Sequence, residues 1–235
     1  GPGQSDILLL LTDGEEVGLL GARLFCQKHP WARDVKAVIN LEARGNSGQS
    51  LMFETSAHNR ALIERYAQSI SRPATGSLFY AVYKQLPNDT DLTIFKRAGM
   101  KGYGFAFIGG AQNYHSPRDT VARLNLSSLQ HQGQNALELL LALDQSKGSL
   151  EAEDDAVFFD ILGVVTIWWP QSWTVFFYIL VLIPLITGFI SQWKRKRIQL
   201  KALLLTLFML LLLFVIPIAL SLLIQFPNLR VRADQ

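Results

Sequence analysis

Two long apolar stretches near the end of the chain constrain its fold more than any other feature. Residues 173–190 and 202–224 carry no charged side chain, and each approaches the roughly 20 residues that a helix needs to cross a bilayer. Pro184 and Pro217 lie inside them, a position that membrane helices tolerate better than helices in water. We therefore predict a transmembrane helical hairpin in contact with a lipid bilayer. Two buried core helices are the alternative, which the length of the stretches and the tryptophans beside them oppose.

The basic residues around these stretches predict an orientation. Lys194–Arg197 reads KRKR and lies between the two stretches, whereas no Lys or Arg occurs from residue 148 to residue 193. Short loops rich in Lys and Arg stay in the cytoplasm. We therefore predict a multi-pass membrane protein with a cytoplasmic basic loop. The preceding domain is then extracytoplasmic, in a periplasm or an organelle lumen.

The first 147 residues have the alternating pattern of an α/β domain. Apolar runs of strand length predict strands at 6–12, 35–41, 51–54 and 102–108, and helical spacing predicts helices at 16–27, 59–70, 91–98 and 127–143. This alternation predicts a mostly parallel or mixed sheet sandwiched by helices. Because the pattern enters a strand almost at once, we expect a domain truncated at its start. An acidic linker and juxtamembrane segment is expected at 148–172, and the membrane hairpin at 173–235.

Composition excludes several classes of protein. Residues 1–155 carry 15 Lys and Arg against 17 Asp and Glu, while residues 156–235 carry 7 against 2. The excess positive charge therefore belongs to the apolar end, so no nucleic-acid partner is expected. Cys26 is the only cysteine, which excludes an internal disulfide framework and cysteine-rich zinc modules.

Two adjacent acids follow the first apolar run, in the segment LLLLTDGEEVGLLGA. Asp13 followed by Glu16 fits a helix capping box, and acids at a helix start suit the helix dipole. The same pair also fits a general base next to a metal ligand. The segment alone favours capping.

The sheet order expected from the pattern favours the catalytic interpretation. Glu15 and Glu16 would leave the first strand at its carboxyl end, and Glu42 would leave the second at the same edge, where open α/β sheets bind ligands. The aromatic strand 102–108 runs into a loop that carries His115. Two carboxylates and an imidazole that converge in this way form a plausible zinc ligand set.

Five segments, in order, carry a resemblance to a known family: LLLLTDGEEVGLLGA, VINLEARGNSG, LPNDTDLTIFKRAG, GYGFAFIGG and NYHSPRDT. Over about residues 5–145 the chain resembles metallopeptidase family 28, the zinc aminopeptidases that include bacterial leucyl aminopeptidase. It looks most like the branch with carboxy-terminal membrane helices. The resemblance implies a zinc exopeptidase-like fold and a membrane-anchored aminopeptidase that cleaves peptide substrates with two zinc ions.

The resemblance also implies roles for individual residues. Glu15 would be the general base that takes a proton from the attacking water. Glu16 and His115 would share one zinc ion, and Glu42, where the family often has Asp, would hold the other. Asp91 would support the site without binding metal. Arg44 and Asn46 follow Glu42 on the same edge and would contact substrate; the alternative is that they are polar residues of a surface loop.

The family's remaining metal ligands are a His in a His-x-Asp motif and a bridging Asp, both upstream of the Glu pair. Only 14 residues precede Glu15 in this sequence, and none is His. We therefore expect this chain by itself to bind zinc weakly and to have little activity. Two other functions stay open: a glutaminyl cyclase-like acyltransferase, which resembles the same fold, and a non-catalytic ectodomain in which the ligands have decayed.

Overall fold

The computed structural model describes residues 3, 5–145, 149–195, 201, 203–209 and 211–212. The chain divides into two compact units, Gly1–Thr174 and Val175–Gln235. The first is an α/β unit and the second begins within a long apolar helix. Each is considered by itself.

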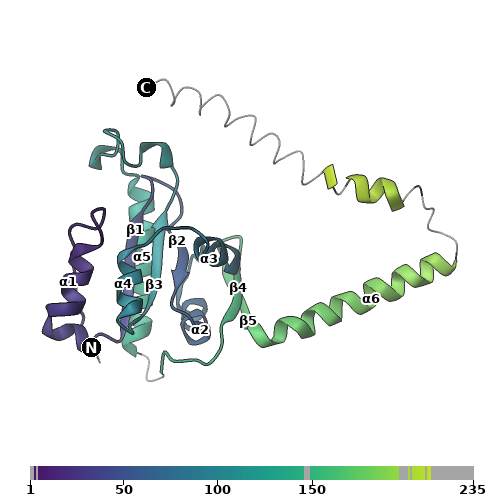
Figure 1. The fold of residues 1–235 in the computed structure, drawn as a ribbon, viewed down its shortest axis with the longest axis horizontal. Helices are drawn as coiled ribbons and strands as arrows, with labels where there is room; N and C mark the ends of the chain where they lie inside the picture. The colour runs from purple at the N-terminus through teal and green to yellow at the C-terminus, as the bar shows by residue number, and fades with distance from the viewer. Residues whose placement is uncertain are drawn as a thin grey trace. The chain divides into compact units, whose positions relative to one another are not determined.

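A mixed three-stranded sheet forms the centre of the first unit, in the order β1-β3-β2 (Figure 1). Strand β1 (Ala37–Ala43) runs parallel to β3 (Lys101–Phe107), and β2 (Leu51–Thr55) runs antiparallel to β3. The α/β class with a mixed sheet is therefore confirmed. Each of these strands lies within two residues of its predicted position.

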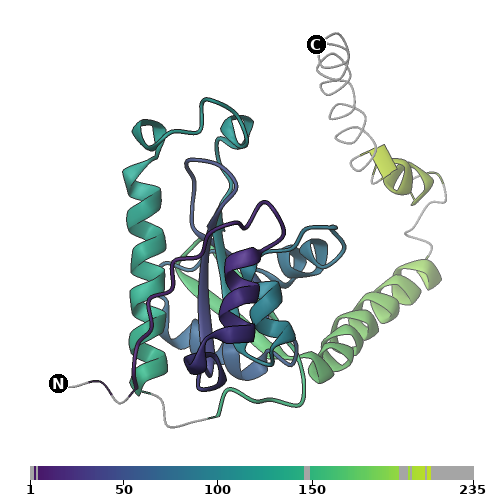
Figure 2. The same ribbon diagram turned by 60° about the vertical axis from the view of Figure 1, so that its left-hand side comes forward.

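Helices cover both faces of this sheet, as Figure 2 shows from a second side. Helices α2 (Arg60–Ser69) and α5 (Leu126–Gln145) share one apolar core with the sheet, and α1 (Leu20–Lys28) and α4 (Asp91–Arg97) share another. Strand β3 serves both cores. Its Tyr103 and Phe105 are fully buried in the first, whereas a Cβ on Gly102 would lie 2.6 Å from Leu92 of α4. The alternating glycines of β3 thus let α4 pack closely against the sheet.

The predicted first strand, residues 6–12, is wrong. The structure assigns no strand there, and the exposed fraction of the side chain reaches 82% at Leu9 and 86% at Leu11. A run of leucines reads as a buried strand only if a neighbouring strand supplies hydrogen bonds. In the described part of the chain, β1 pairs with β3 alone and residues 6–12 pair with no strand. The parallel pair that builds the sheet edge is therefore β1 and β3.

Two features were not predicted. Helix α3 (Ser77–Tyr83) follows β2 and α2. A second sheet, the antiparallel hairpin of β4 (Ala156–Ile161) and β5 (Val165–Pro170), occupies most of the segment expected to be a linker. Its Ala156 and Phe158 belong to the core shared by α2 and the main sheet. Short 3-10 helices complete the unit at Pro30–Arg33, Ala111–Asn113, Val121–Arg123 and Gln171–Trp173.

Helix α6 (Thr174–Lys194) corresponds to the first predicted membrane span. Together with the preceding turn, Gln171–Lys194 gives 24 residues, long and apolar enough to cross a membrane, with no side chain buried inside the protein. Of the second predicted span, residues 203–209 and 211–212 are helical, and the remainder lies outside the described residues. The predicted transmembrane hairpin therefore stays a prediction, with one helix of the length and apolar composition that it requires.

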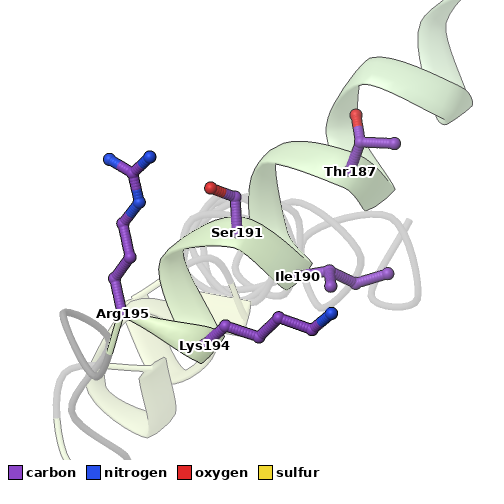
Figure 3. A pocket seen from close by; sticks show the side chains of 5 residues that line it. All are labelled: Thr187, Ile190, Ser191, Lys194 and Arg195. Atoms are coloured by element: carbon purple, nitrogen blue, oxygen red, sulfur yellow. The ribbon is translucent and has the colours of Figure 1, made fainter.

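A shallow hollow follows the end of α6 and is lined by Thr187, Ile190, Ser191, Lys194 and Arg195 (Figure 3). All five side chains come from one side of a single helix. None is a carboxylate or an imidazole, so we assign no catalytic site to this hollow.

Candidate active site

The carboxyl ends of β1 and β3 form the edge that carries the candidate site. Glu42 lies one residue before the end of β1 and opposite Ala106 of β3. His115 lies in the loop that follows β3, eight residues beyond its last residue. Since the two strands are parallel neighbours, Glu42 and the loop that carries His115 emerge at the same edge.

Two loops at this edge are held together at very short range. The backbone N–H of Asn46 donates a hydrogen bond to the backbone carbonyl of Gly109 at 3.0 Å. The backbone carbonyl of Asn46 accepts one from the backbone N–H of Asn125 at 2.8 Å. A Cβ on Gly110 would lie 2.1 Å from Asn46 Oδ1. Asn46, only 8% exposed, therefore braces the loop that leads to His115. A contact between Asn46 and substrate stays a prediction.

Glu16 and His115 meet. His115 Nε2 lies 2.6 Å from Glu16 Oε1, although 99 residues separate them in sequence. Both side chains are more than half exposed, at 61% and 56%. His115 adopts a left-handed backbone conformation, with φ of 54°, which is uncommon for a residue other than glycine and recurs at functional sites.

Aromatic and cationic groups fix the His115 ring. Tyr114 stacks on it with ring centroids 3.8 Å apart, and the Arg44 guanidinium lies 5.8 Å from the centre of the Tyr114 ring. Arg44 is therefore placed at the site edge through Tyr114. Its contact with substrate stays a prediction.

Glu15 lies at the start of a tight turn, because its carbonyl accepts hydrogen bonds from the amides of Gly18 and Leu19. Helix α1 begins only at Leu20, so the helix predicted from residue 16 starts four residues later than expected. The expected capping box is not formed, since the Asp13 carboxylate accepts from the adjacent Gly14 amide instead. The pair of acids thus occupies a turn in front of the helix.

Neighbouring acids influence the protonation of Glu15. Partial desolvation raises the pKa of Glu15 above its ordinary value, and the charges of Glu16 and Asp91 raise this pKa further, while His115 lowers it. These influences show that the residues form one electrostatically coupled group. A carboxylate with a raised pKa holds a proton more readily, which suits a general base.

Glu42 is the most strongly perturbed acid of the group. Burial raises the pKa of Glu42 to about 7, and the charges of Glu15 and Asp91 add to this effect. The Asn40 amide opposes it by donating a hydrogen bond to Glu42 Oε1 at 2.9 Å. A half-buried carboxylate among other acids needs a compensating cation.

Asp91 lies at the first position of α4 and is 5% exposed. Its Oδ2 accepts a hydrogen bond of 2.5 Å from Thr12, whereas its Oδ1 is buried with no hydrogen-bond partner in the described structure. This bond ties the segment before the Glu pair to α4. Asp91 therefore sits behind the acids, in agreement with a supporting position.

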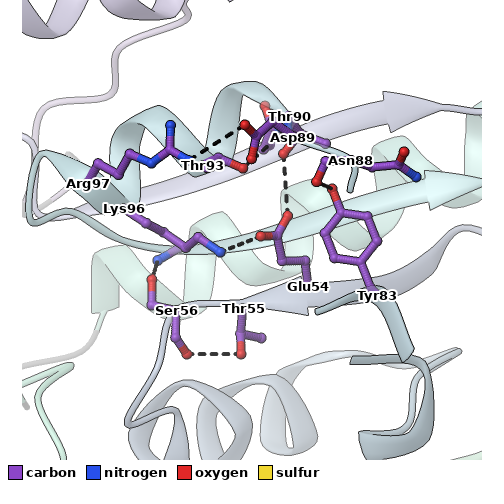
Figure 4. Close-up of polar contacts among 12 residues, drawn as sticks. Glu54, Thr55, Ser56, Tyr83, Asn88, Asp89, Thr90, Thr93, Lys96 and Arg97 are labelled. Carbon is purple, nitrogen blue, oxygen red and sulfur yellow. Dashed lines mark hydrogen bonds and ion pairs between the residues drawn. The ribbon is translucent and has the colours of Figure 1, made fainter. Parts of the chain in front are cut away.

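A buried polar network holds the start of α4 in place (Figure 4). Glu54 of β2, whose side chain is 4% exposed, pairs with Lys96 of α4, and the Thr90 hydroxyl donates a hydrogen bond to Glu54 at 3.3 Å. Thr90 and Thr93 form a reciprocal capping box at the helix start. The network therefore fixes the helix end that presents Asp91.

The residues at this edge are of the kinds that bind zinc, which takes imidazole nitrogen and carboxylate oxygen. Glu16 and His115 are close enough to share one ion after a small separation. Among the described residues, however, no group of three or more His, Cys, Asp or Glu side chains is arranged to hold a metal. The side chains at this edge are therefore of the right chemical kind to bind zinc, but the described residues do not form a complete binding site.

An α/β fold with acids and an imidazole at the carboxyl edge of its sheet is an arrangement that metal-dependent hydrolases use. Comparison with known protein families matches residues 1–140 to Peptidase family M28. The match covers more than half of the chain, so the chain belongs to this family. The resemblance seen in the sequence motifs is confirmed.

Individual relatives are membrane or endoplasmic-reticulum proteases by name. Endoplasmic reticulum metallopeptidase 1 of Mus musculus is 33% identical over 177 residues, 72% of this chain and 20% of its own length. The Vacuolar membrane protease of Eremothecium gossypii is 30% identical over 161 residues, 67% of this chain and 16% of its own. The chain thus spans about a fifth of the length of these relatives.

Among solved structures, an Aminopeptidase from Aneurinibacillus sp. strain AM-1 is similar with a TM-score of 0.41 and 15% identity. The likeness covers 60% of this chain and 34% of that one.

Three residues that shape the site were not predicted from the sequence: Thr12, Asn40 and Tyr114. Tyr114 precedes His115 directly, and Asn40 lies two residues before Glu42 on the same strand face. These spacings are the signals that could have identified Asn40 as a partner of Glu42 and Tyr114 as a partner of His115. Thr12 gave no comparable signal, because its partner is 79 residues away.

Proposed function

We propose that this chain supplies active-site residues of a membrane-anchored zinc exopeptidase, an aminopeptidase. One observation carries the proposal: the 2.6 Å contact between Glu16 and His115 next to Glu15. Its class rests on membership of Peptidase family M28. The proposed substrate is a peptide with a free amino end.

Glu16 and His115 would hold one zinc ion and Glu42 the second. Bound zinc would polarise the scissile carbonyl and lower the pKa of water. Glu15 takes the proton from the attacking water and passes it to the departing amine. Asp91 keeps the Glu15 turn in place through Thr12. Tyr114 holds the His115 ring by stacking on it, and Arg44, next to the Tyr114 ring, would contact the substrate.

Membrane anchoring is the second part of the proposal. It is supported by the 24-residue apolar helix Gln171–Lys194 and by the basic run that follows it. A cytoplasmic basic loop would put the α/β unit in a periplasm or a lumen. The printed names of the relatives, which refer to the endoplasmic reticulum and to the vacuolar membrane, agree with such a location.

Zinc content and peptide cleavage test the proposal together. An active protein that contains this chain should release the amino-terminal residue of a peptide, lose this activity with a chelator and regain it with zinc. Glu15→Gln should abolish turnover while zinc content is retained. Release of pyroglutamate from an amino-terminal Gln peptide without peptide hydrolysis would instead indicate the cyclase reaction. A protein that retains almost no zinc would indicate a non-catalytic ectodomain.

The chain by itself should behave differently. It contains no residues that match the family's upstream His and bridging Asp, so we propose that it binds zinc weakly and turns over little substrate alone. Measurable turnover by this chain, abolished by Glu15→Gln, would contradict that expectation.

A further inference from the structure

The β4–β5 hairpin has an outward face that is apolar and, at most of its positions, exposed. Its two strands alternate between an inward and an outward side. Phe158 and Ala156 point inward into the core with α2. The outward side consists of three cross-strand pairs, all of them apolar: Val157 with Trp169, Phe159 with Ile167, and Ile161 with Val165. A hairpin that faced water would carry polar residues on this side.

The exposure of these side chains is substantial. Phe159 is 42% exposed, Val165 47% and Ile167 39%. The rings of Phe159 and Trp169 lie 6.0 Å apart in an edge-to-face arrangement, so the outward face is an ordered aromatic surface. Polar residues do not interrupt it, and a patch of this kind marks an interaction surface.

The tip of the hairpin is a second, independent sign. Leu162 and Gly163 both have positive φ, 53° and 69°, and the Val164 amide donates to the Ile161 carbonyl at 3.0 Å. Two successive turn residues with positive φ strongly favour Asn, Asp or Gly at both positions. Leu162 is strained there and is 92% exposed, so its side chain contributes nothing to the fold. A leucine that is both strained and exposed indicates that its side chain interacts with something outside the folded unit.

The sequence around the hairpin identifies the partner. No charged residue occurs between Asp160 and Lys194, so the tip, strand β5 and the candidate membrane helix form one uncharged run. Only Gln171–Trp173 separates β5 from α6; three residues span about 10 Å even when extended. Trp169 on the outward face and Trp173 both precede α6 within a few residues, and tryptophan is enriched where a protein meets the lipid headgroups.

From these features we propose that the outward face and the Leu162–Val164 tip of the β4–β5 hairpin lie in the interfacial layer of a lipid bilayer. This inference rests on the membrane anchoring proposed above. The hairpin would then fix how the α/β unit stands on the membrane, in addition to the tether that α6 provides.

The test uses the full chain in phosphatidylcholine vesicles and a single fluorescent label. Cys26 is the only cysteine, so Cys26→Ser permits one new site at a time: Val164→Cys in the hairpin tip, Gln130→Cys on the exposed side of α5, or Leu182→Cys within α6. The label is an environment-sensitive fluorophore. Quenching by nitroxide-bearing lipid is compared with quenching by aqueous iodide.

We expect the label at residue 164 to be quenched by the lipid nitroxide at least about twofold more strongly than the label at residue 130, and to be shielded from iodide. Equal iodide quenching at both sites, with the α6 label quenched by lipid, would overturn the hairpin proposal and leave the anchoring intact. An α6 label that lipid does not quench would overturn both. Shielding of residue 164 from both quenchers would show that protein covers the tip, which also overturns the proposal.

Leu162→Asn separates membrane contact from folding. Asn is well suited to the left-handed turn, so the hairpin should stay folded, with hydrogen exchange of the Phe158 amide unchanged or slower. Lipid quenching of the label at residue 164 should fall. Unchanged quenching would contradict the assignment of the tip.

Discussion

Two pairs in the same unit, each made of a carboxylate and a basic side chain, differ sharply in their surroundings. Glu16 and His115 form a pair with side chains 61% and 56% exposed, joined by two loops. Glu54 and Lys96 form a pair with side chains 4% and 27% exposed, joined by a strand and a helix. An exposed pair adds little stability, whereas breaking a buried one leaves an uncompensated charge. The contact between Glu16 and His115 can therefore be replaced by contacts to a metal ion at little cost in stability. The buried contact between Glu54 and Lys96 is needed to keep the unit folded.

The largest expected effect is on activity at the exposed site. In an active zinc-loaded protein that contains this chain, Glu15→Gln should lower kcat by about 10³-fold or more, because the base is lost while the side chain keeps its size. Hydrogen exchange of the β3 amides should be unchanged, because Glu15 is part of no buried pair. A variant that retains activity would show that another group takes the proton.

The next largest effect should come from the buried pair. Lys96→Met should lower the free energy of unfolding by about 3 kcal/mol, because Glu54 is left charged and unpaired. Arg97→Met is the matched control on the same helix. Arg97 pairs with Asp89 at 3.5 Å, with both side chains more than half exposed, and its loss should cost less than about 1 kcal/mol.

Hydrogen exchange of the β3 amides in detergent measures both variants. A cost for Arg97→Met as large as that for Lys96→Met would remove the distinction between the two kinds of pair.

A third prediction concerns Glu42 in zinc-free protein. The pKa of Glu42 is about 7 when folded, against 4.5 for the ordinary side chain. Between pH 4.5 and pH 7 the Glu42 carboxyl is ionised in the unfolded chain but still protonated in the folded one. The free energy of unfolding therefore falls as pH rises through this range and is lowest above pH 7. Glu42→Gln should therefore raise the free energy of unfolding by roughly 2 kcal/mol at pH 8 and by little at pH 4.

The measurement is hydrogen exchange in a chelator at the two pH values. Zinc should reverse the sign at pH 8, because the charged carboxylate then has a cation. A pH-independent difference between wild type and Glu42→Gln would contradict the burial of this acid.

The smallest stability effect is expected at the exposed pair. Glu16→Gln should change the free energy of unfolding by less than about 1 kcal/mol. The same substitution should weaken zinc binding, because the neutral amide is a poorer ligand than a carboxylate. A large loss of stability without a change in zinc binding would assign Glu16 to the fold.

The sequence predicted those features that depend on local pattern. Strand β3 was recognisable because it is an apolar run rich in aromatics. Glu42 and the loop that carries His115 could be predicted to share an edge because the carboxyl ends of parallel strands meet there. The strand predicted at residues 6–12 was wrong because a run of leucines does not reveal whether a neighbouring strand is present to pair with it. The hairpin was missed because its uncharged second strand continues into the apolar helix, so the whole run resembles a membrane segment.

Contacts between loops that are far apart in the sequence could not be predicted. The bond between Thr12 and Asp91, and the close approach of Asn46 to Gly110, both depend on backbone paths that no periodicity encodes. The Glu54–Lys96 pair likewise follows from the packing of α4 on glycines of β3. Side chains placed by tertiary packing could therefore not be predicted, although the residues of the acidic edge could.

Zinc titration by calorimetry tests the central claim most directly. The account predicts that wild-type chain binds zinc weakly, that His115→Asn lowers the affinity at least about tenfold because an imidazole ligand is lost, and that the control His29→Asn leaves it unchanged. Equal affinity of wild type and His115→Asn would contradict the assignment of the Glu16–His115 pair as a metal site.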